Sequence, residues 1–98
     1  MTVTLFYFDG CPHWMTMDER LKAVLRRIGR EDAVERRRVE TIEDAQAVGF
    51  TGSPMILLNG SDPFGDLTTP ASLSCRMYQT PDGPAGSPTL DQLVEVLR

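Results

Sequence analysis

The sequence predicts a small α/β domain in which helices cover both faces of a mixed sheet. Three observations lead to this fold class. A β-branched and aromatic run at 3–8 is followed by helical periodicity at 12–28. The same order of strand and helix recurs up to residue 48, which favours a β-α-β arrangement. The apolar run Met55–Leu58 then ends in Asn59-Gly60, a typical hairpin turn, and a helix closes the chain.

The first helix is expected over 12–28, because apolar residues recur there at helical spacing while charged residues fill the other face. Pro12 suits the first turn, where its missing N–H is one of the groups left unpaired in any case. Gly29 supplies the stop signal. The predicted inward face consists of Trp14, Met17, Leu21, Val24, Leu25 and Ile28.

The middle of the chain repeats the alternation in a shorter form. A second strand is expected at 33–40, flanked by charge and near a sheet edge. A short helix follows at 41–48, with Thr41 and Asp44 in the spacing of an N-terminal cap. The third strand is the apolar run at 55–58.

The C-terminal part is expected to complete the sheet. A loop rich in Gly, Pro, Ser, Thr and Asp over 61–72 lengthens the hairpin, and 72–80 forms the returning strand. A second loop at 80–88 leads into a last helix that Ser87-Pro88 opens. The predicted order is β-α-β-α-β-β-α, in one domain that spans residues 1–98.

Composition narrows the classes of partner. The 98 residues are 41% apolar and 24% charged, as in an ordinary globular protein, and 14 acidic residues outweigh 10 basic ones. A nucleic-acid binder would show a basic stripe, whereas the run at 36–38 is flanked by acids and predicts a solvated strand face. The apolar runs are too short for a membrane helix, and the N-terminus lacks the features of a signal peptide. We therefore expect a cytoplasmic protein with no nucleic-acid or membrane partner.

The two cysteines, Cys11 and Cys75, are too few for a disulfide scaffold, so they are incidental or carry redox or metal chemistry. Cys11 lies at the expected N-cap of the first helix, where partial positive charge and unpaired N–H groups lower the pKa of a thiol. A protonated His13 would add to this effect. The alternatives are a small residue tolerated in a turn for Cys11 and a buried small apolar residue for Cys75.

Two stretches, FDGCPHW at 8–14 and GSP at 52–54, resemble the thioredoxin-like superfamily. Its members place a reactive cysteine at the N-terminus of the first helix and a cis-proline at the opening of the next sheet strand, beside that cysteine. Those positions correspond to Cys11 and Pro54. All seven expected elements fall in the thioredoxin order, so the resemblance implies a thioredoxin-like fold with a mixed four-stranded sheet.

A longer pattern is similar to a group of short bacterial, often actinobacterial, thioredoxin-like proteins. Its parts are YFDGCP at 7–12, GSP, NGSDPF at 59–64 and CRMY at 75–78, followed by a Gly/Pro-rich loop and a last helix. The Cys-Pro-His portion also looks like the active-site opening of bacterial periplasmic disulfide oxidants, without their last cysteine.

The resemblance implies a site at the N-terminal end of the first helix. We expect no cofactor and no resident metal there. Trp14 holds the position of the second cysteine of a Cys-x-x-Cys motif and cannot resolve a mixed disulfide. Trp14 also lies on the apolar face of the helix, where packing alone would explain it. The candidate catalytic residues are Cys11 and Cys75. The candidate substrate-binding residues are Pro12, His13, Trp14, Ser53 and Pro54.

Three functions remain open on these residues. The first is a monothiol-motif oxidoreductase, in which Cys11 acts on disulfides, glutathione adducts or peroxides and either glutathione or Cys75 resolves the intermediate. The second is a non-catalytic binding module, whose groove around Trp14 and Pro54 holds a peptide or protein partner. The third is a thiolate site for a soft metal or an organomercurial, formed by Cys11 and Cys75.

Overall fold

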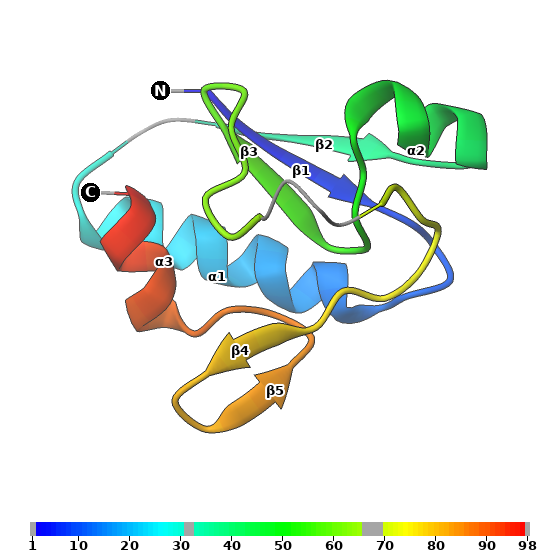
Figure 1. Ribbon diagram of the computed structural model, residues 1–98. Helices are drawn as coiled ribbons and strands as arrows, with labels where there is room; N and C mark the ends of the chain where they lie inside the picture. The colour runs from blue at the N-terminus through cyan, green and yellow to red at the C-terminus, as the bar shows by residue number, and fades with distance from the viewer. Residues whose placement is uncertain (1, 31–32, 66–69, 98) are drawn as a thin grey trace.

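Strands and helices alternate along the first half of the chain, and a small hairpin precedes the last helix. The computed structural model describes residues 2–30, 33–65 and 70–97 (Figure 1). Residues 66–69, in the predicted loop at 61–72, lie outside the described residues. The elements are β1 (Val3–Tyr7), α1 (His13–Arg27), β2 (Val34–Arg38), α2 (Ile42–Val48), β3 (Met55–Leu58), β4 (Tyr78–Thr80), β5 (Gly83–Ala85) and α3 (Leu90–Leu97).

A three-stranded mixed sheet in the order β2-β1-β3 forms the centre of the fold. The central strand β1 runs parallel to β2 and antiparallel to β3. Figure 1 shows α1 and α3 on one side of this sheet, with α2 beyond its other side. The predicted mixed α/β class with a mixed sheet is therefore confirmed.

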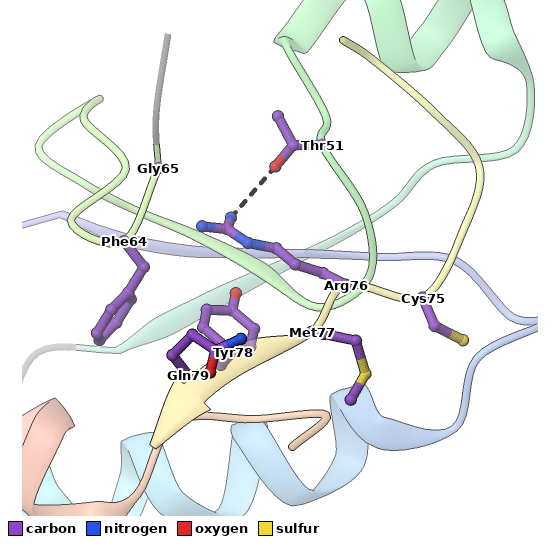
Figure 2. A pocket seen from close by; sticks show the side chains of 8 residues that line it. All are labelled: Thr51, Phe64, Gly65, Cys75, Arg76, Met77, Tyr78 and Gln79. Atoms are coloured by element: carbon purple, nitrogen blue, oxygen red, sulfur yellow. Dashed lines mark hydrogen bonds between the residues drawn. The ribbon is translucent and has the colours of Figure 1, made fainter. Parts of the chain in front are cut away.

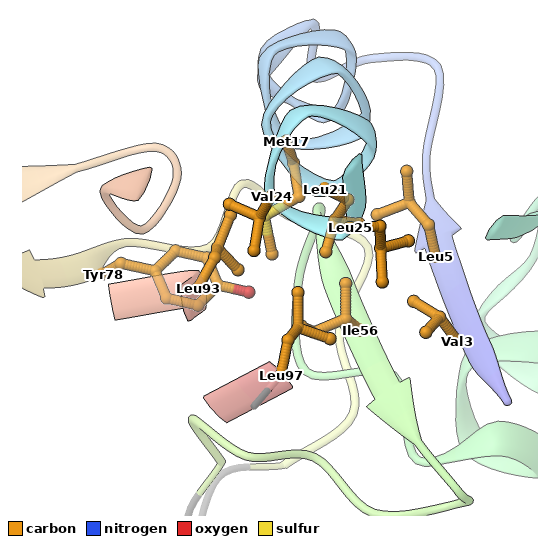
Figure 3. Packing of buried hydrophobic residues seen from close by; sticks show 10 residues of the cluster. All are labelled: Val3, Leu5, Met17, Leu21, Val24, Leu25, Ile56, Tyr78, Leu93 and Leu97. Atoms are coloured by element: carbon orange, nitrogen blue, oxygen red, sulfur yellow. The ribbon is translucent and has the colours of Figure 1, made fainter. Parts of the chain in front are cut away.

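Alternating side chains of the sheet supply two apolar cores, because successive residues of a strand point to opposite faces. Leu5 and Ile56 are partners in register and belong to the core against α1 and α3 (Figure 3). Phe6 and Met55 are the next partners and belong to the core beside α2. The buried residues of the first core are Val3, Leu5, Met17, Leu21, Val24, Leu25, Ile56, Tyr78, Leu93 and Leu97. Those of the second are Phe6, Val39, Ala45, Phe50 and Met55.

Helix α1 is one residue shorter than predicted at each end, and Gly29 stops it as predicted. At its C-terminus, Gly29 has a φ of 75°, and the amide of Arg30 donates to the carbonyl of Leu25, which gives a Schellman motif. At its N-terminus the N-cap is Pro12, without a side-chain cap, so Cys11 precedes the cap and does not form it. Within the described residues, no helix has the length and apolar character needed to cross a membrane.

The basic run on β2 is the solvated face that the sequence predicts. Arg36, Arg37 and Arg38 are all exposed on this edge strand. Each of them has acidic partners, so the run is not a surplus of positive charge. The ion pairs join Arg36 to Asp18 at 3.7 Å, Arg37 to Glu35 at 2.9 Å, and Arg38 to Asp9 at 3.0 Å and to Glu40.

The predicted four-stranded sheet is wrong, although the turn that suggested it is present. Asn59 and Gly60 have φ values of 52° and 86°, the signs that a type I′ turn requires. The hairpin then stops at a single bridge between Leu58 and Ser61. The predicted strand at 72–80 is reduced to β4, which pairs with β5 in a separate two-stranded sheet.

A local partner explains why β4 leaves the main sheet. Pro81, Asp82 and Gly83 are typical turn residues, and they bring β5 beside β4 over the shortest loop. Thr80 reinforces this turn, since its hydroxyl donates to the carbonyl of Gly83 and accepts from the amide of Asp82. A return to β3 would close a much longer loop, so the hairpin forms where a loop was expected.

Candidate functional site

The candidate site is built around a disulfide between the two cysteines. Cys11 and Cys75 lie 64 residues apart in sequence, and their Cα atoms are 5.6 Å apart. Cys11 is fully buried, whereas Cys75 is exposed. Cys75 is therefore not the buried apolar residue that the simplest interpretation of the sequence expects, and it is the partner of Cys11.

A tight turn positions Cys11 between β1 and α1. The amide of Cys11 donates to the carbonyl of Phe8 at 3.1 Å, which closes the turn over Asp9 and Gly10. The ring of Phe8 lies against Gly10, where a side chain would collide with it. The sulfur of Cys11 is thus fixed at the beginning of α1 by local geometry that the stretch FDGCP encodes.

Cys75 is held by the residue that precedes Pro54. Ser74, Cys75 and Arg76, here called the Cys75 segment, lie beside Ser53 as a single parallel bridge. The amide of Ser53 donates to the carbonyl of Ser74 at 2.7 Å, and the amide of Arg76 donates to the carbonyl of Ser53 at 2.9 Å. The Ser53-Pro54 peptide bond is cis.

Ser53 also contacts the turn on the other side of the disulfide. It is fully buried, and its hydroxyl accepts a hydrogen bond from the amide of Phe8 at 3.1 Å. Its backbone therefore holds the Cys75 segment while its side chain holds the turn before Cys11. Through this one residue, the stretch GSP brings two distant cysteines together.

The Cys75 segment approaches the chain at Gly52 more closely than a side chain would allow. Gly52 has a φ of 136°, a conformation that other residues rarely adopt. A Cβ atom at this position would lie 2.9 Å from the Cβ of Arg76 and 3.1 Å from its Cα. Glycine is therefore required at position 52 for two reasons: its backbone conformation disfavours other residues, and a side chain would collide with Arg76.

Arg76 fastens the segment to the hairpin turn and to the core. Its Nη1 donates to Asp62 at 2.6 Å and to Thr51 at 3.2 Å, and both charged side chains are mostly buried, at 11% and 16% exposed. The guanidinium also lies 4.6 Å from the ring centroid of Tyr78, in a cation–π contact. The hydroxyl of Tyr78 donates to the carbonyl of Pro54.

Burial raises the pKa of the Tyr78 phenol above its ordinary value of 10.0, because the phenolate would lose its hydration. The nearby Asp62 carboxylate acts in the same direction, and the Arg76 guanidinium partly opposes both. Tyr78 is therefore a neutral donor that ties the beginning of β4, two residues after the Cys75 segment, to Pro54, the residue before β3.

Replacing Tyr78 with phenylalanine should lower the free energy of unfolding by about 1–2 kcal/mol at neutral pH, since the carbonyl of Pro54 loses its donor. Because the folded pKa is raised, the unfolded chain releases the phenolic proton first, and Tyr78 costs stability as the pH rises above about 10. Urea unfolding at pH 7 and pH 10.5 measures both effects. The wild type should lose more stability over this interval than Tyr78→Phe, and equal losses would contradict the assignment.

The other candidate residues lie around the disulfide in different roles. Pro12 and His13 are exposed, and the ring of His13 packs so closely on Gly86 that a side chain there would collide with it. Trp14 is half-buried and stacks on Tyr7, with ring centroids 4.3 Å apart, which agrees with a packing role. Pro54 is fully buried.

A pocket of about 450 Å³ opens beside Cys75 (Figure 2). Its walls include Thr51, Phe64, Arg76, Met77 and Tyr78. Figure 2 shows the Arg76 side chain extending toward Thr51, while the Cys75 side chain points to the opposite side of the chain. Sequence reasoning missed Gly52, Asp62, Arg76 and Tyr78 as parts of the site. The stretches NGSDPF and CRMY were the available signal, because they contain three of these four residues.

In residues 2–30, 33–65 and 70–97, no three His, Cys, Asp or Glu side chains come together in a group that could hold a metal ion. The chain matches no protein-family model, no curated protein and no solved structure. The arrangement of the two cysteines is therefore the basis for a functional proposal.

Proposed function

We propose that this protein carries out thiol–disulfide exchange, with Cys11 and Cys75 alternating between a disulfide and a dithiol. The observation that carries the proposal is their disulfide, which joins a buried cysteine at the beginning of α1 to an exposed cysteine 64 residues later. In this proposal Cys75 supplies the second thiol of the redox pair, which Trp14 cannot provide. The activity then needs two cysteines, although the local motif contains one.

The position of Cys11 supports exchange chemistry. In the dithiol form, the partial positive charge at the beginning of α1 favours a thiolate, which is the nucleophilic form of cysteine. Oxidation by a substrate disulfide R–S–S–R forms the Cys11–Cys75 bond and releases two thiols. Reduction by two thiols reverses the reaction, so the electrons balance without a cofactor.

A thioredoxin-like relationship is part of the same proposal. Support comes from the β1-α1-β2 order, from Cys11 next to the N-cap of α1, and from the cis peptide at Ser53-Pro54 before β3. We expect the protein to act in the cytoplasm, where disulfides are usually transient and belong to catalysis or redox sensing. Its partner would be a small thiol or disulfide, such as glutathione, or a protein disulfide.

Equilibration of the folded protein in glutathione buffers of graded redox ratio tests this proposal. Acid quenching, alkylation and mass spectrometry should show that both cysteines change together, in one reversible two-electron transition. Cys75→Ser should abolish the transition, and Ser74→Ala, which keeps both cysteines, should retain it. Reduction seen only under conditions that unfold the chain would contradict the proposal.

A further inference from the structure

We propose that Cys75 is the cysteine that external thiols attack, so that Cys75 carries the mixed disulfide and Cys11 is the leaving thiolate. This inference rests on the proposed function and assigns the two sulfurs their roles. It reverses the expectation from sequence, in which Cys11 is the reacting nucleophile and Cys75 the resolving thiol.

Access to the disulfide is the first argument. A thiolate must approach one of the two sulfurs on the side opposite to the bond that breaks. Cys11 is fully buried, enclosed by the turn before α1 and by the Cys75 segment that is bonded to it. Cys75 is exposed, so it is the residue of the pair that an external thiol can approach from solvent.

The surroundings of Cys75 are the second argument. The pocket of about 450 Å³ borders Cys75 and not Cys11, and its volume falls in the range that holds small ligands. Met77, 57% exposed, projects from the same stretch of chain and offers apolar surface beside it (Figure 2). A small thiol therefore has room for its body beside the residue that it attacks.

The leaving group is the third argument. Exchange is faster when the departing thiol has the lower pKa. Cys11 departs at the beginning of α1, where the helix dipole and unpaired amide groups stabilise negative charge. The incoming R–S⁻ forms a bond with the sulfur of Cys75, and the electron pair of the old bond leaves with Cys11. A second R–S⁻ then attacks the R–S sulfur of the mixed disulfide, which forms R–S–S–R and releases Cys75 as a thiolate, so that the dithiol protein remains.

The reverse direction follows from the same geometry. In the dithiol protein, the thiolate of Cys75 attacks an external disulfide R–S–S–R first, which forms the mixed disulfide and releases one R–S⁻. The thiolate of Cys11, held against the Cys75 segment, then attacks the sulfur of Cys75 and expels R–S⁻. Because the resolving cysteine, Cys11, is buried, it forms no mixed disulfide with an external thiol. Unrelated disulfides therefore do not trap the protein at Cys11.

Peptide mapping of the wild-type protein tests the assignment directly. Oxidised protein is mixed with glutathione, quenched with acid at short times, alkylated and digested. We expect glutathione on Cys75 and the alkyl group on Cys11. Glutathione on Cys11 would overturn the assignment and leave the proposed function standing, whereas the absence of any exchange in the folded protein would refute the proposed function itself.

Single-cysteine variants test the same assignment if the mixed disulfide is too short-lived to be trapped. Reduced Cys11→Ser, which retains Cys75, should react with glutathione disulfide faster than reduced Cys75→Ser by about tenfold or more, since its thiol is exposed. Equal rates, or a faster Cys75→Ser, would overturn the assignment. Cys11→Ala replaces Cys11→Ser if the serine hydroxyl prevents folding at this buried position, and circular dichroism confirms that each variant is folded.

Discussion

Replacing Cys75 with serine should lower the free energy of unfolding by about 4 kcal/mol, the expected entropic contribution of a cross-link that closes a loop of this length. The loop is long because 64 residues separate the two cysteines. For a domain of this size, the loss corresponds to a fall in Tm of about 15–30 °C. Cys75 is the better position to change, because it is exposed and serine there leaves no buried polar group.

Chemical reduction provides the matched control for this variant. Urea unfolding with and without a strong reductant should show the same loss of about 4 kcal/mol in the wild type and no change in Cys75→Ser. A wild type whose stability is unaffected by complete reduction would contradict the prediction. It would mean that the hydrogen bonds of Ser53 and Arg76 already hold the segment in place.

This stability is linked to the redox chemistry. If the disulfide stabilises the folded chain, folding stabilises the disulfide against reduction by the same free energy, since the two equilibria form one cycle. The measured loss of unfolding free energy therefore also measures how strongly the fold favours the disulfide over the dithiol. A large value predicts that the folded protein holds its disulfide much more tightly than the unfolded chain does.

The parts of the fold that the sequence predicts are those with local causes. Helix α1 follows from apolar spacing and from Gly29, and the cap of α2 follows from Thr41, whose hydroxyl accepts from the amide of Asp44 at 3.1 Å. The turn at Asn59-Gly60 is likewise set by two residues that tolerate positive φ. Each of these signals lies within a few residues of the feature that it determines.

The number of strands in the main sheet has no such local cause. Tyr78–Thr80 has the composition of a strand, and composition does not say which partner it finds. The closest partner in sequence is Gly83–Ala85, which the sequence does not indicate as a strand because its glycine and proline are typical of loops. Strand pairing is thus the step at which sequence reasoning failed.

The candidate site, like the fold, has residues that short stretches of sequence indicate and residues that only the tertiary structure brings into it. The stretches FDGCPHW and GSP point to Cys11 and Ser53 through their resemblance to the thioredoxin-like superfamily, which concerns short local stretches of sequence. The contribution of Arg76 is not readable, since it depends on Asp62 and Thr51, 14 and 25 residues away.

Replacing Gly52 with alanine should destabilise the protein by about 3 kcal/mol or more and loosen the Cys75 segment. The backbone conformation at a φ of 136° alone costs a non-glycine residue roughly 1–3 kcal/mol. The added methyl group would also lie within 3.1 Å of the backbone of Arg76 and force the segment away from Ser53. Reduction by glutathione should then be several-fold faster, because the two hydrogen bonds that hold Cys75 are weakened.

Gly83→Ala is the matched control, because it separates backbone strain from contact. Gly83 also has a positive φ, of 103°, but a Cβ there would meet nothing within 4 Å. Gly83→Ala should therefore cost only the conformational part, roughly 1–3 kcal/mol, and leave the rate of disulfide reduction unchanged. If both variants lose the same stability and keep the wild-type rate, the contact at Gly52 does not hold the segment. If Gly52→Ala alone speeds reduction, the close packing of Arg76 on Gly52 determines how firmly the protein presents Cys75.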